Sequence, residues 1–118
     1  MQIKIKGTKI ELTPEVQDYV QKKVDMLDKY LGDIKVLNCD VELELTTKHH
    51  NKGDIYRAEI NLELPGEVLW VEKTDNELDK AIDKVKDLAA QSIKKYKEKR
   101  IDRNREVNEA QEAQEEEF

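Results

Sequence analysis

Seven cationic side chains lie within twelve residues near the end of the sequence, in the stretch KKYKEKRIDRNR from residue 94 to residue 105. They are Lys94, Lys95, Lys97, Lys99, Arg100, Arg103 and Arg105. Ammonium and guanidinium groups at this density bind phosphate oxygens, and basic runs of this kind are typical of nucleic-acid contacts. Because only Glu98 and Asp102 oppose them, the segment carries a local charge of +5 inside a chain of net charge -6. We therefore expect any RNA-binding surface to be local.

An acidic segment follows the basic one directly. Residues 106 to 118 contain six glutamates and no cation. Either the two segments neutralise each other, or each of them addresses a different partner. Favourable interaction of the cations with a helix dipole is a third explanation of the basic segment.

Further lysines are expected on a helical surface. At 3.6 residues per turn, four polar residues fall within about 60° of one another, on the side of a helix away from its apolar stripe. They are Lys80, Lys84, Gln91 and Lys95. On an earlier helix, Lys22 and Lys29 flank Met26 in a similar line. An ordinary solvated helix face explains any one of these lysines equally well, so the basic segment carries the RNA hypothesis.

The stretch TTKHHNKGD predicts a polar loop with Lys48 and Lys52 around two adjacent histidines. Adjacent histidines in an extended loop point apart, and a metal ion needs three or four converging ligands. We expect no metal here, and an exposed or RNA-contacting loop instead.

Carboxylates at alternate positions could suggest a general acid and base pair. They are Asp40, Glu42, Glu44, Glu59 and Glu63. The solvated face of a strand explains the same spacing, and the sequence brings no nucleophile or phosphate-binding glycine loop near them. We expect neither an enzyme nor a bound cofactor.

The helices that position these residues have clear start and stop signals. Thr13 as N-cap and Pro14 at the first helical position predict a helix that ends at Gly32. Its apolar face is Val16, Val20, Val24, Leu27 and Leu31. Thr74 and Glu77 predict a capping box for a second helix, which presents an apolar stripe from Leu78 to Tyr96.

Period-two alternation predicts strands at residues 3 to 6, 37 to 45, 56 to 64 and 67 to 73. Pro65 and Gly66 favour a type II turn between the last two strands. If that turn has two residues, Val68 and Trp70 face away from the helices. A shift of one residue would bury Trp70 instead, and both alternatives stay open.

The expected fold is α+β, with the order β-α-β-β-β-α, an antiparallel four-stranded sheet and two helices on one face. We predict a domain over residues 1 to 100, followed by a helix extension and an acidic tail over residues 101 to 118. The composition of residues 106 to 118 predicts disorder.

The sequence indicates a cytoplasmic monomer. The longest apolar run is VLWV at residues 68 to 71, and MQIKIKG at the start lacks the apolar stretch of a signal peptide. The one cysteine, Cys39, lies among apolar neighbours of a strand, so we expect a buried thiol that forms no internal disulfide.

Several stretches resemble the ribosome hibernation factor family in its short form. They are IELTPEV, LDKYL, DVELEL, and AID followed some turns later by KYKEK, within residues 1 to 100. The resemblance implies binding in the decoding channel of the small ribosomal subunit, where the domain blocks messenger and transfer RNA and silences idle ribosomes. The long form adds a domain for which we expect no room here, and the acidic tail resembles that of the ribosome-associated inhibitor, or protein Y, branch. That branch implies a tail that lies along the messenger path and opposes ribosome pairing.

Basic residues of the family are matched in type at Lys23, Lys29, Lys95, Lys97 and Lys99, which the resemblance assigns to RNA contact. The chain departs from the family pattern where it has Met26, Leu88 and Gln91, and we expect Lys80 and Lys84 to supply the missing charge. Two other functions remain: a double-stranded-RNA-binding domain, and a protein-binding module that uses the open sheet face or the acidic tail.

Overall fold

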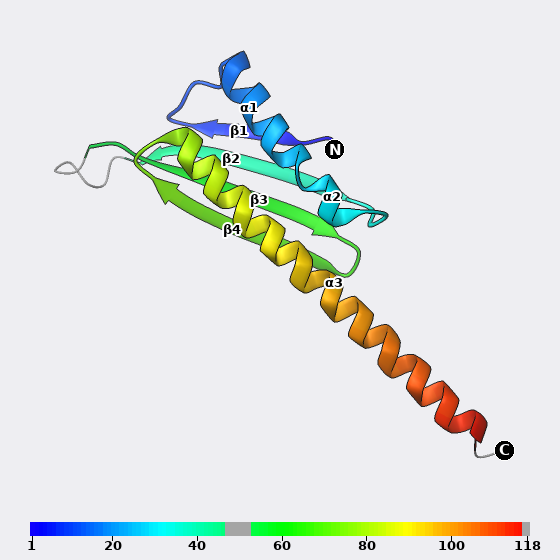
Figure 1. Ribbon diagram of the computed structural model, residues 1–118. Helices are drawn as coiled ribbons and strands as arrows, with labels where there is room; N and C mark the ends of the chain where they lie inside the picture. Colours follow the sequence, from blue (N-terminus) through cyan, green and yellow to red (C-terminus); the bar gives the residue numbers. More distant parts are fainter. Residues whose placement is uncertain (47–52, 117–118) are drawn as a thin grey trace.

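The structure, a computed structural model, is a four-stranded sheet with all of its helices on one face (Figure 1). It describes the backbone of residues 1–46 and 53–116, and the side chains of residues 1–46 and 53–101. The sheet order is β1-β2-β3-β4. The elements are β1 (Lys4–Thr8), α1 (Pro14–Asp25), α2 (Asp28–Leu31), β2 (Asn38–Thr46), β3 (Ile55–Leu64), β4 (Glu67–Asp75) and α3 (Leu78–Glu116).

The two-layer α+β architecture and the element order are confirmed, but the prediction of a purely antiparallel sheet is wrong. β1 pairs with β2 in parallel, and the β2–β3 and β3–β4 pairs are antiparallel. The parallel pair follows from the helical crossover, because α1 and α2 return the chain across one face before β2 begins. The sheet is therefore mixed.

The β3–β4 register settles which residues face the helices. Leu69 pairs with Leu62 and Val71 with Ile60, as a two-residue turn requires. Gly66 has a φ of 81°, which a type II turn needs at this position. Trp70 consequently lies on the outer face of the sheet and is 55% exposed.

The core lies between the sheet and the helices and is aliphatic. Leu43, Ile60 and Leu62 from the sheet are buried in one cluster with Val24 and Ile93 from the helices. Cys39 is buried in the same layer, as predicted. Burial raises the pKa of its thiol to about 11, so the thiolate is scarce at neutral pH.

The first predicted helix is broken in two. Thr13 caps it as expected, accepting a hydrogen bond from the Val16 N–H at 3.2 Å, but α1 ends at Asp25. The next two N–H groups, of Met26 and Leu27, bond to the carbonyls three residues earlier, which tightens the turn. Leu27 is fully buried at this break, and α2 then extends to Leu31, with Gly32 as its C-cap.

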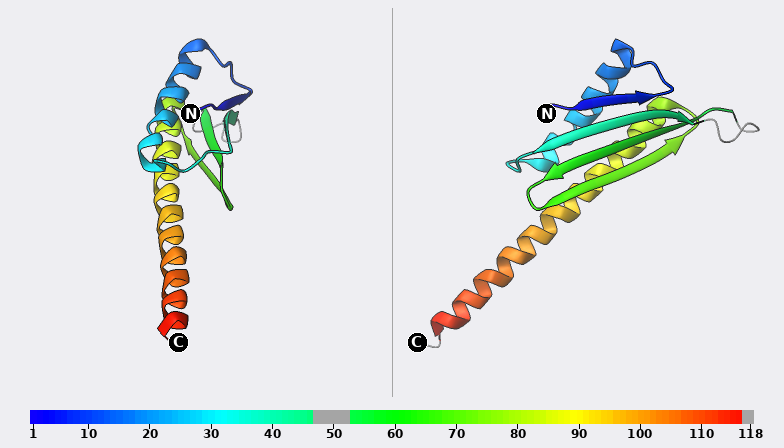
Figure 2. Two further views of the ribbon diagram at one scale, coloured as in Figure 1. Left: turned by 90° about the vertical axis from the view of Figure 1, so that its right-hand side faces the viewer. Right: turned by 180° about the vertical axis from the view of Figure 1, so that it is seen from behind.

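α3 differs from its prediction at both ends. Thr74 lies within β4, so the predicted capping box does not form; the Asp75 carboxylate accepts from the Glu77 N–H at 3.1 Å instead. At the other end the helix continues to Glu116 where the sequence predicts disorder, and Figure 2 shows it projecting well beyond the sheet. Glu, Ala, Gln and Arg are good helix formers, which favours this extension.

Candidate nucleic-acid interface

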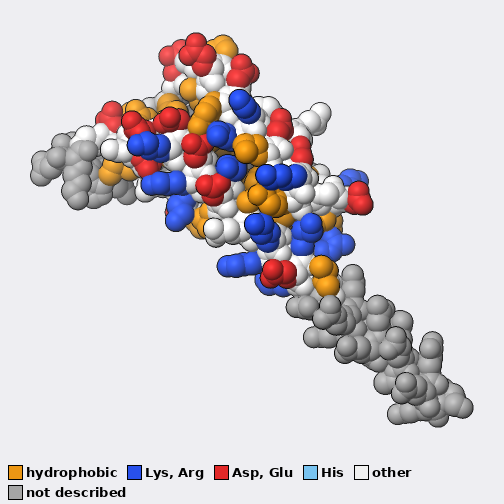
Figure 3. Space-filling view, viewed as in Figure 1, with side chains coloured by type: hydrophobic (Ala, Val, Ile, Leu, Met, Phe, Trp, Pro, Cys, Tyr) orange, Lys and Arg blue, Asp and Glu red, His pale blue; other side chains and the backbone are white. Residues whose placement is uncertain are grey.

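Lys and Arg side chains gather on the helical layer, over α2 and the middle of α3 (Figure 3). Lys22 and Lys29 come from α1 and α2, and Lys94 and Lys95 from α3; all four are exposed. Lys97, on the same stretch of α3, is half-buried. The helical layer thus brings lysines from distant parts of the sequence onto one surface, as RNA binding through phosphates requires.

Tyr30 organises the junction of α2 and α3. The Lys29 and Lys94 ammonium groups each lie 5.0 Å from the centre of its ring. Cation–π attraction of this kind holds two like charges close together that would otherwise repel. Sequence reasoning missed Tyr30, although its place beside Lys29 in LDKYL was a usable signal.

Lys23 has a different role from its neighbour Lys22. Its ammonium group lies 3.3 Å from the Asp83 carboxylate of α3 and 5.4 Å from the centre of the Tyr19 ring. The Tyr19 hydroxyl donates to the same carboxylate at 2.7 Å, and burial and this bond raise the pKa of Tyr19 to about 12. These contacts join α1 to α3, so Lys23 is part of the helix-to-helix packing.

Lys80, Lys84 and Lys99 form ion pairs with acids at the β4 side of α3. Lys80 bonds to Glu77 at 2.7 Å, Lys84 bonds to Asp75, and Lys99 lies 3.7 Å from Glu67. The bond from Lys84 also lowers the pKa of the Asp75 carboxyl. Asp79, Asp83 and Asp87 share this first part of α3, which is therefore less positive than its middle.

Five of the predicted lysines are without such acid partners. Among the side chains that the structure describes, no ion pair is formed by Lys22, Lys29, Lys94, Lys95 or Lys97. Arg100 donates to the Tyr96 hydroxyl at 3.0 Å, and Tyr96 donates to the Pro65 carbonyl at 2.7 Å, which fastens α3 to the β3–β4 turn. Lys48, Lys52 and the side chain of Arg103 lie outside the described residues.

The three residues at which the chain departs from the family pattern lie on the helical layer. Met26 and Gln91 are exposed, whereas Leu88 packs against the core. Met26 and Gln91 therefore leave uncharged gaps in the cationic surface, while the Leu88 side chain contributes to stability.

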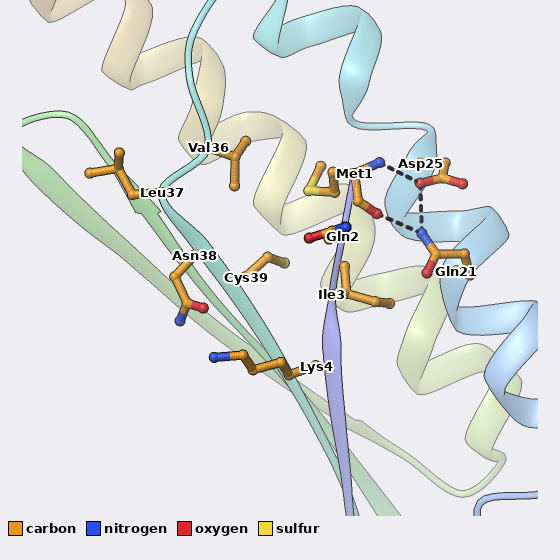
Figure 4. Close-up of a pocket in the computed structure, with 10 residues that line it drawn as sticks. All are labelled: Met1, Gln2, Ile3, Lys4, Gln21, Asp25, Val36, Leu37, Asn38 and Cys39. Carbon is orange, nitrogen blue, oxygen red and sulfur yellow. Dashed lines mark hydrogen bonds and ion pairs between the residues drawn. The ribbon is translucent and has the colours of Figure 1, made fainter.

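A hollow of about 940 Å³ opens beside the first residues of the chain (Figure 4). In it, the amino group of Met1 bonds to Asp25 at 3.0 Å, and Gln21 donates to the Met1 carbonyl at 2.9 Å and to Asp25 at 2.8 Å. These bonds tie the start of the chain to α1. Cys39 also lines the hollow, but its raised pKa makes it a poor nucleophile.

No group of three or more potential metal ligands occurs within residues 1–46 and 53–101. Nor does any helix in the part of the chain that the structure describes combine the length and the apolar character needed to span a membrane.

A family model described as sigma 54 modulation protein / S30EA ribosomal protein matches residues 3–101. The chain belongs to the S30EA ribosomal protein family. The predicted resemblance is thereby confirmed at the level of the family, and the match includes the whole sheet and the cationic part of α3 as far as Arg100.

Curated relatives of this S30EA family chain are ribosome hibernation promotion factors. That of Deinococcus radiodurans is 30% identical over 99 residues, which is 82% of this chain and 50% of the relative. That of Lactococcus lactis is 30% identical over 95 residues, or 79% of this chain and 48% of the relative. This chain therefore spans about half the length of these relatives.

Solved structures share the fold of the S30EA family chain. The N-terminal domain of Thermus thermophilus protein Y is 36% identical, with a TM-score of 0.70 over 81% of this chain and 99% of that domain. A ribosomal subunit interface protein from Coxiella burnetii has a TM-score of 0.69 over 82% of this chain and 98% of its own, at 18% identity, which shows the fold alone.

Proposed function

We propose that this chain is a ribosome-binding hibernation factor that occupies the decoding channel of the small ribosomal subunit and blocks messenger and transfer RNA. The cationic surface formed by Lys22, Lys29, Lys94, Lys95 and Lys97 contacts ribosomal RNA. The observation that carries the proposal is this surface on a domain of the S30EA family. The names of the curated relatives and of protein Y support the same function.

The arrangement of charge suits structured RNA. Cations held on a rigid helical layer meet phosphates without ordering a flexible segment, and release of counterions supplies affinity. The outer sheet face carries mostly carboxylates, so electrostatics would orient the helical layer toward the RNA. Within the predicted site, we assign the larger share of binding to the middle of α3 and a smaller share to Lys80 and Lys84, because these two lysines lie among acids.

Sedimentation of the purified protein with small subunits, large subunits and free RNA tests the proposal. We expect co-sedimentation with small subunits, weakening steeply as salt rises, and competition with messenger and transfer RNA. Equal binding to all three, or binding only to large subunits, would contradict the proposed site.

The acidic segment gives a second test. We expect a chain that ends at residue 105 to bind a short structured RNA within about twofold of the full chain. Residues 106–116 continue the α3 helix, which rises about 1.5 Å per residue away from the cations rather than folding back on them. On small subunits, the truncated chain should let messenger re-enter more readily and should restrict ribosome pairing less.

The measurement is RNA affinity of both chains at two salt concentrations, together with a messenger competition assay. A tenfold gain in RNA affinity on truncation, lost at high salt, would show that the acidic segment competes for the cations.

A further inference from the structure

The outer face of the sheet is a second surface whose chemistry differs from that of the helical layer. The helices that the structure describes all lie on the opposite face of the sheet (Figure 2, right). The outer face presents cross-strand rows of side chains. One row is Lys4, Asp40, Asn61 and Trp70, and the next is Lys6, Glu42, Glu59 and Glu72.

The apolar part of this face is at β4. Trp70 and Val68 are 55% and 56% exposed, and as alternate residues of one strand they point to the same side. An exposed tryptophan beside another large apolar side chain is typical of a surface that binds a partner protein. The tryptophan ring buries a large apolar area on binding and loses little side-chain entropy.

Trp70 is held in place before any partner arrives. Its indole N–H donates to the Glu59 carboxylate, which also binds Arg57 at 2.6 Å. Arg57 in turn binds Glu44 at 2.8 Å, Glu42 at 3.0 Å and Glu72 at 3.2 Å. The bond to Glu59 therefore fixes the orientation of the indole ring, which reduces the side-chain entropy lost when a partner binds.

The charge around Trp70 selects the partner. Among the strand residues that the structure describes, carboxylates outnumber cations on the outer face by six to three. The six are Asp40, Glu42, Glu44, Glu59, Glu63 and Glu72, and the three are Lys4, Lys6 and Arg57. Both of these lysines lie on β1, at the far edge of the sheet from β4. Phosphate is therefore repelled near Trp70, and a cationic group is attracted there.

We propose that the outer face of β3 and β4 docks a basic, arginine-containing segment of a partner protein. An arginine guanidinium stacks on the Trp70 ring and pairs with Glu63 on β3, or with Glu72, the next outward residue of β4, whose carboxylate it then shares with Arg57 at 3.2 Å. Arginine suits this site better than lysine, because its planar group stacks on an aromatic face and still donates to a carboxylate. The chain would thus bind RNA on one face and a basic protein segment on the other.

Trp70 is the one tryptophan of the chain, so its fluorescence reports directly on this face. The probe is a ten-residue peptide that alternates arginine and serine, titrated to millimolar concentration into the full chain. We expect a saturable change in tryptophan fluorescence, weaker binding of the matching lysine–serine peptide, and no saturable change with a short structured RNA. Absence of saturation with the arginine peptide, or saturation with the RNA alone, overturns the proposal.

Variants separate this face from general charge attraction. With a labelled peptide, Trp70→Ala is expected to weaken binding about fivefold or more, and the pair Glu63→Gln and Glu72→Gln by a similar factor. The matched control removes two carboxylates from α1, Glu15→Gln and Asp18→Asn, and should leave affinity within twofold.

Thermal unfolding identifies any variant that fails to fold. If Trp70→Ala fails to fold, Trp70→Phe replaces it in the binding assay; it keeps an aromatic ring, so we expect a smaller loss of peptide affinity. Equal losses for both carboxylate pairs, or none for a folded Trp70 variant, overturn the proposal. The test uses no ribosome, so its outcome is independent of the proposed function.

Discussion

Reversing the charge of Lys94 and Lys95 is expected to weaken binding to small ribosomal subunits by roughly tenfold or more and to flatten its salt dependence. Both lysines are exposed on the middle of α3. Between residues 88 and 101 of this helix, the one acidic residue is Glu98. Each phosphate contact that is lost lowers the slope of log K against log salt by about 0.7 to 0.9. The double variant Lys94→Glu and Lys95→Glu should therefore show a slope smaller by about 1.4 to 1.8 in a binding series over several salt concentrations.

α3 itself offers a matched control. Lys80→Glu and Lys84→Glu make the same change of charge in the same helix, but at residues that already bond to Glu77 and Asp75. We expect a loss of about threefold or less from this pair, because its surroundings are already acidic. Equal losses from the two pairs would mean that net charge, and not the middle of α3, determines binding; no loss from the first pair would remove it from the interface.

Local patterns in the sequence predicted most of the fold. Alternation from Leu37 to Leu45 corresponds to β2. For Trp70 the sequence left two alternatives open, and the structure has the two-residue turn at Pro65 and Gly66, which leaves Trp70 exposed. The apolar stripe of α3 is buried as expected, with Val85, Ile93 and Tyr96 among its members. These features succeed because the side-chain periods of strands and helices are set by backbone geometry alone.

Features that depend on contacts between distant segments were not predictable in this way. The direction of β1 depends on how α1 crosses the sheet, and the break after Asp25 depends on the space that Leu27 finds in the core. The same holds for the candidate site. The position of β4 beside α3 determines which lysines pair with acids. Lys84 and Lys95 are predicted to share one face of a helix, but in the structure Lys84 bonds to Asp75 at the end of β4, and Lys95 forms no ion pair among the described side chains.

Arg57 was predicted only as a polar member of the alternating pattern in its strand, yet it has the largest number of ion-pair partners among the described side chains. It binds four carboxylates, those of Glu42, Glu44, Glu59 and Glu72, at 2.6 to 3.2 Å. Its own side chain is 18% exposed. The four acids come from three strands, so one cation offsets their mutual repulsion across the middle of the sheet.

Replacing Arg57 with methionine is therefore expected to lower the free energy of unfolding by about 2 kcal/mol at pH 7. Breaking a fully buried ion pair costs about 3 to 5 kcal/mol, and the partial exposure of this network reduces that figure. Lys73→Met is the control, since it removes an exposed cation from β4 at a position with no ion pair among the described residues, and should cost less than about 0.5 kcal/mol. Chemical denaturation of both variants measures the difference.

The pH dependence of this loss distinguishes repulsion from packing. The bond from Arg57 holds the pKa of Glu59 below the ordinary glutamate value of 4.5, so the stabilisation it provides is present above that value and is lost as the pH falls through the lower, folded pKa. The wild-type chain should thus be more stable than the Arg57→Met variant by about 2 kcal/mol at pH 7, and this difference in unfolding free energy should narrow below about pH 4.5 as the carboxylates take up protons.

A triple variant gives the second test. Adding Glu42→Gln and Glu59→Gln to Arg57→Met should restore much of the stability at pH 7, because two of the four repelling charges are then absent. If this triple variant is as unstable as the single one at every pH, the arginine stabilises the sheet through the packing of its side chain and not through its charge.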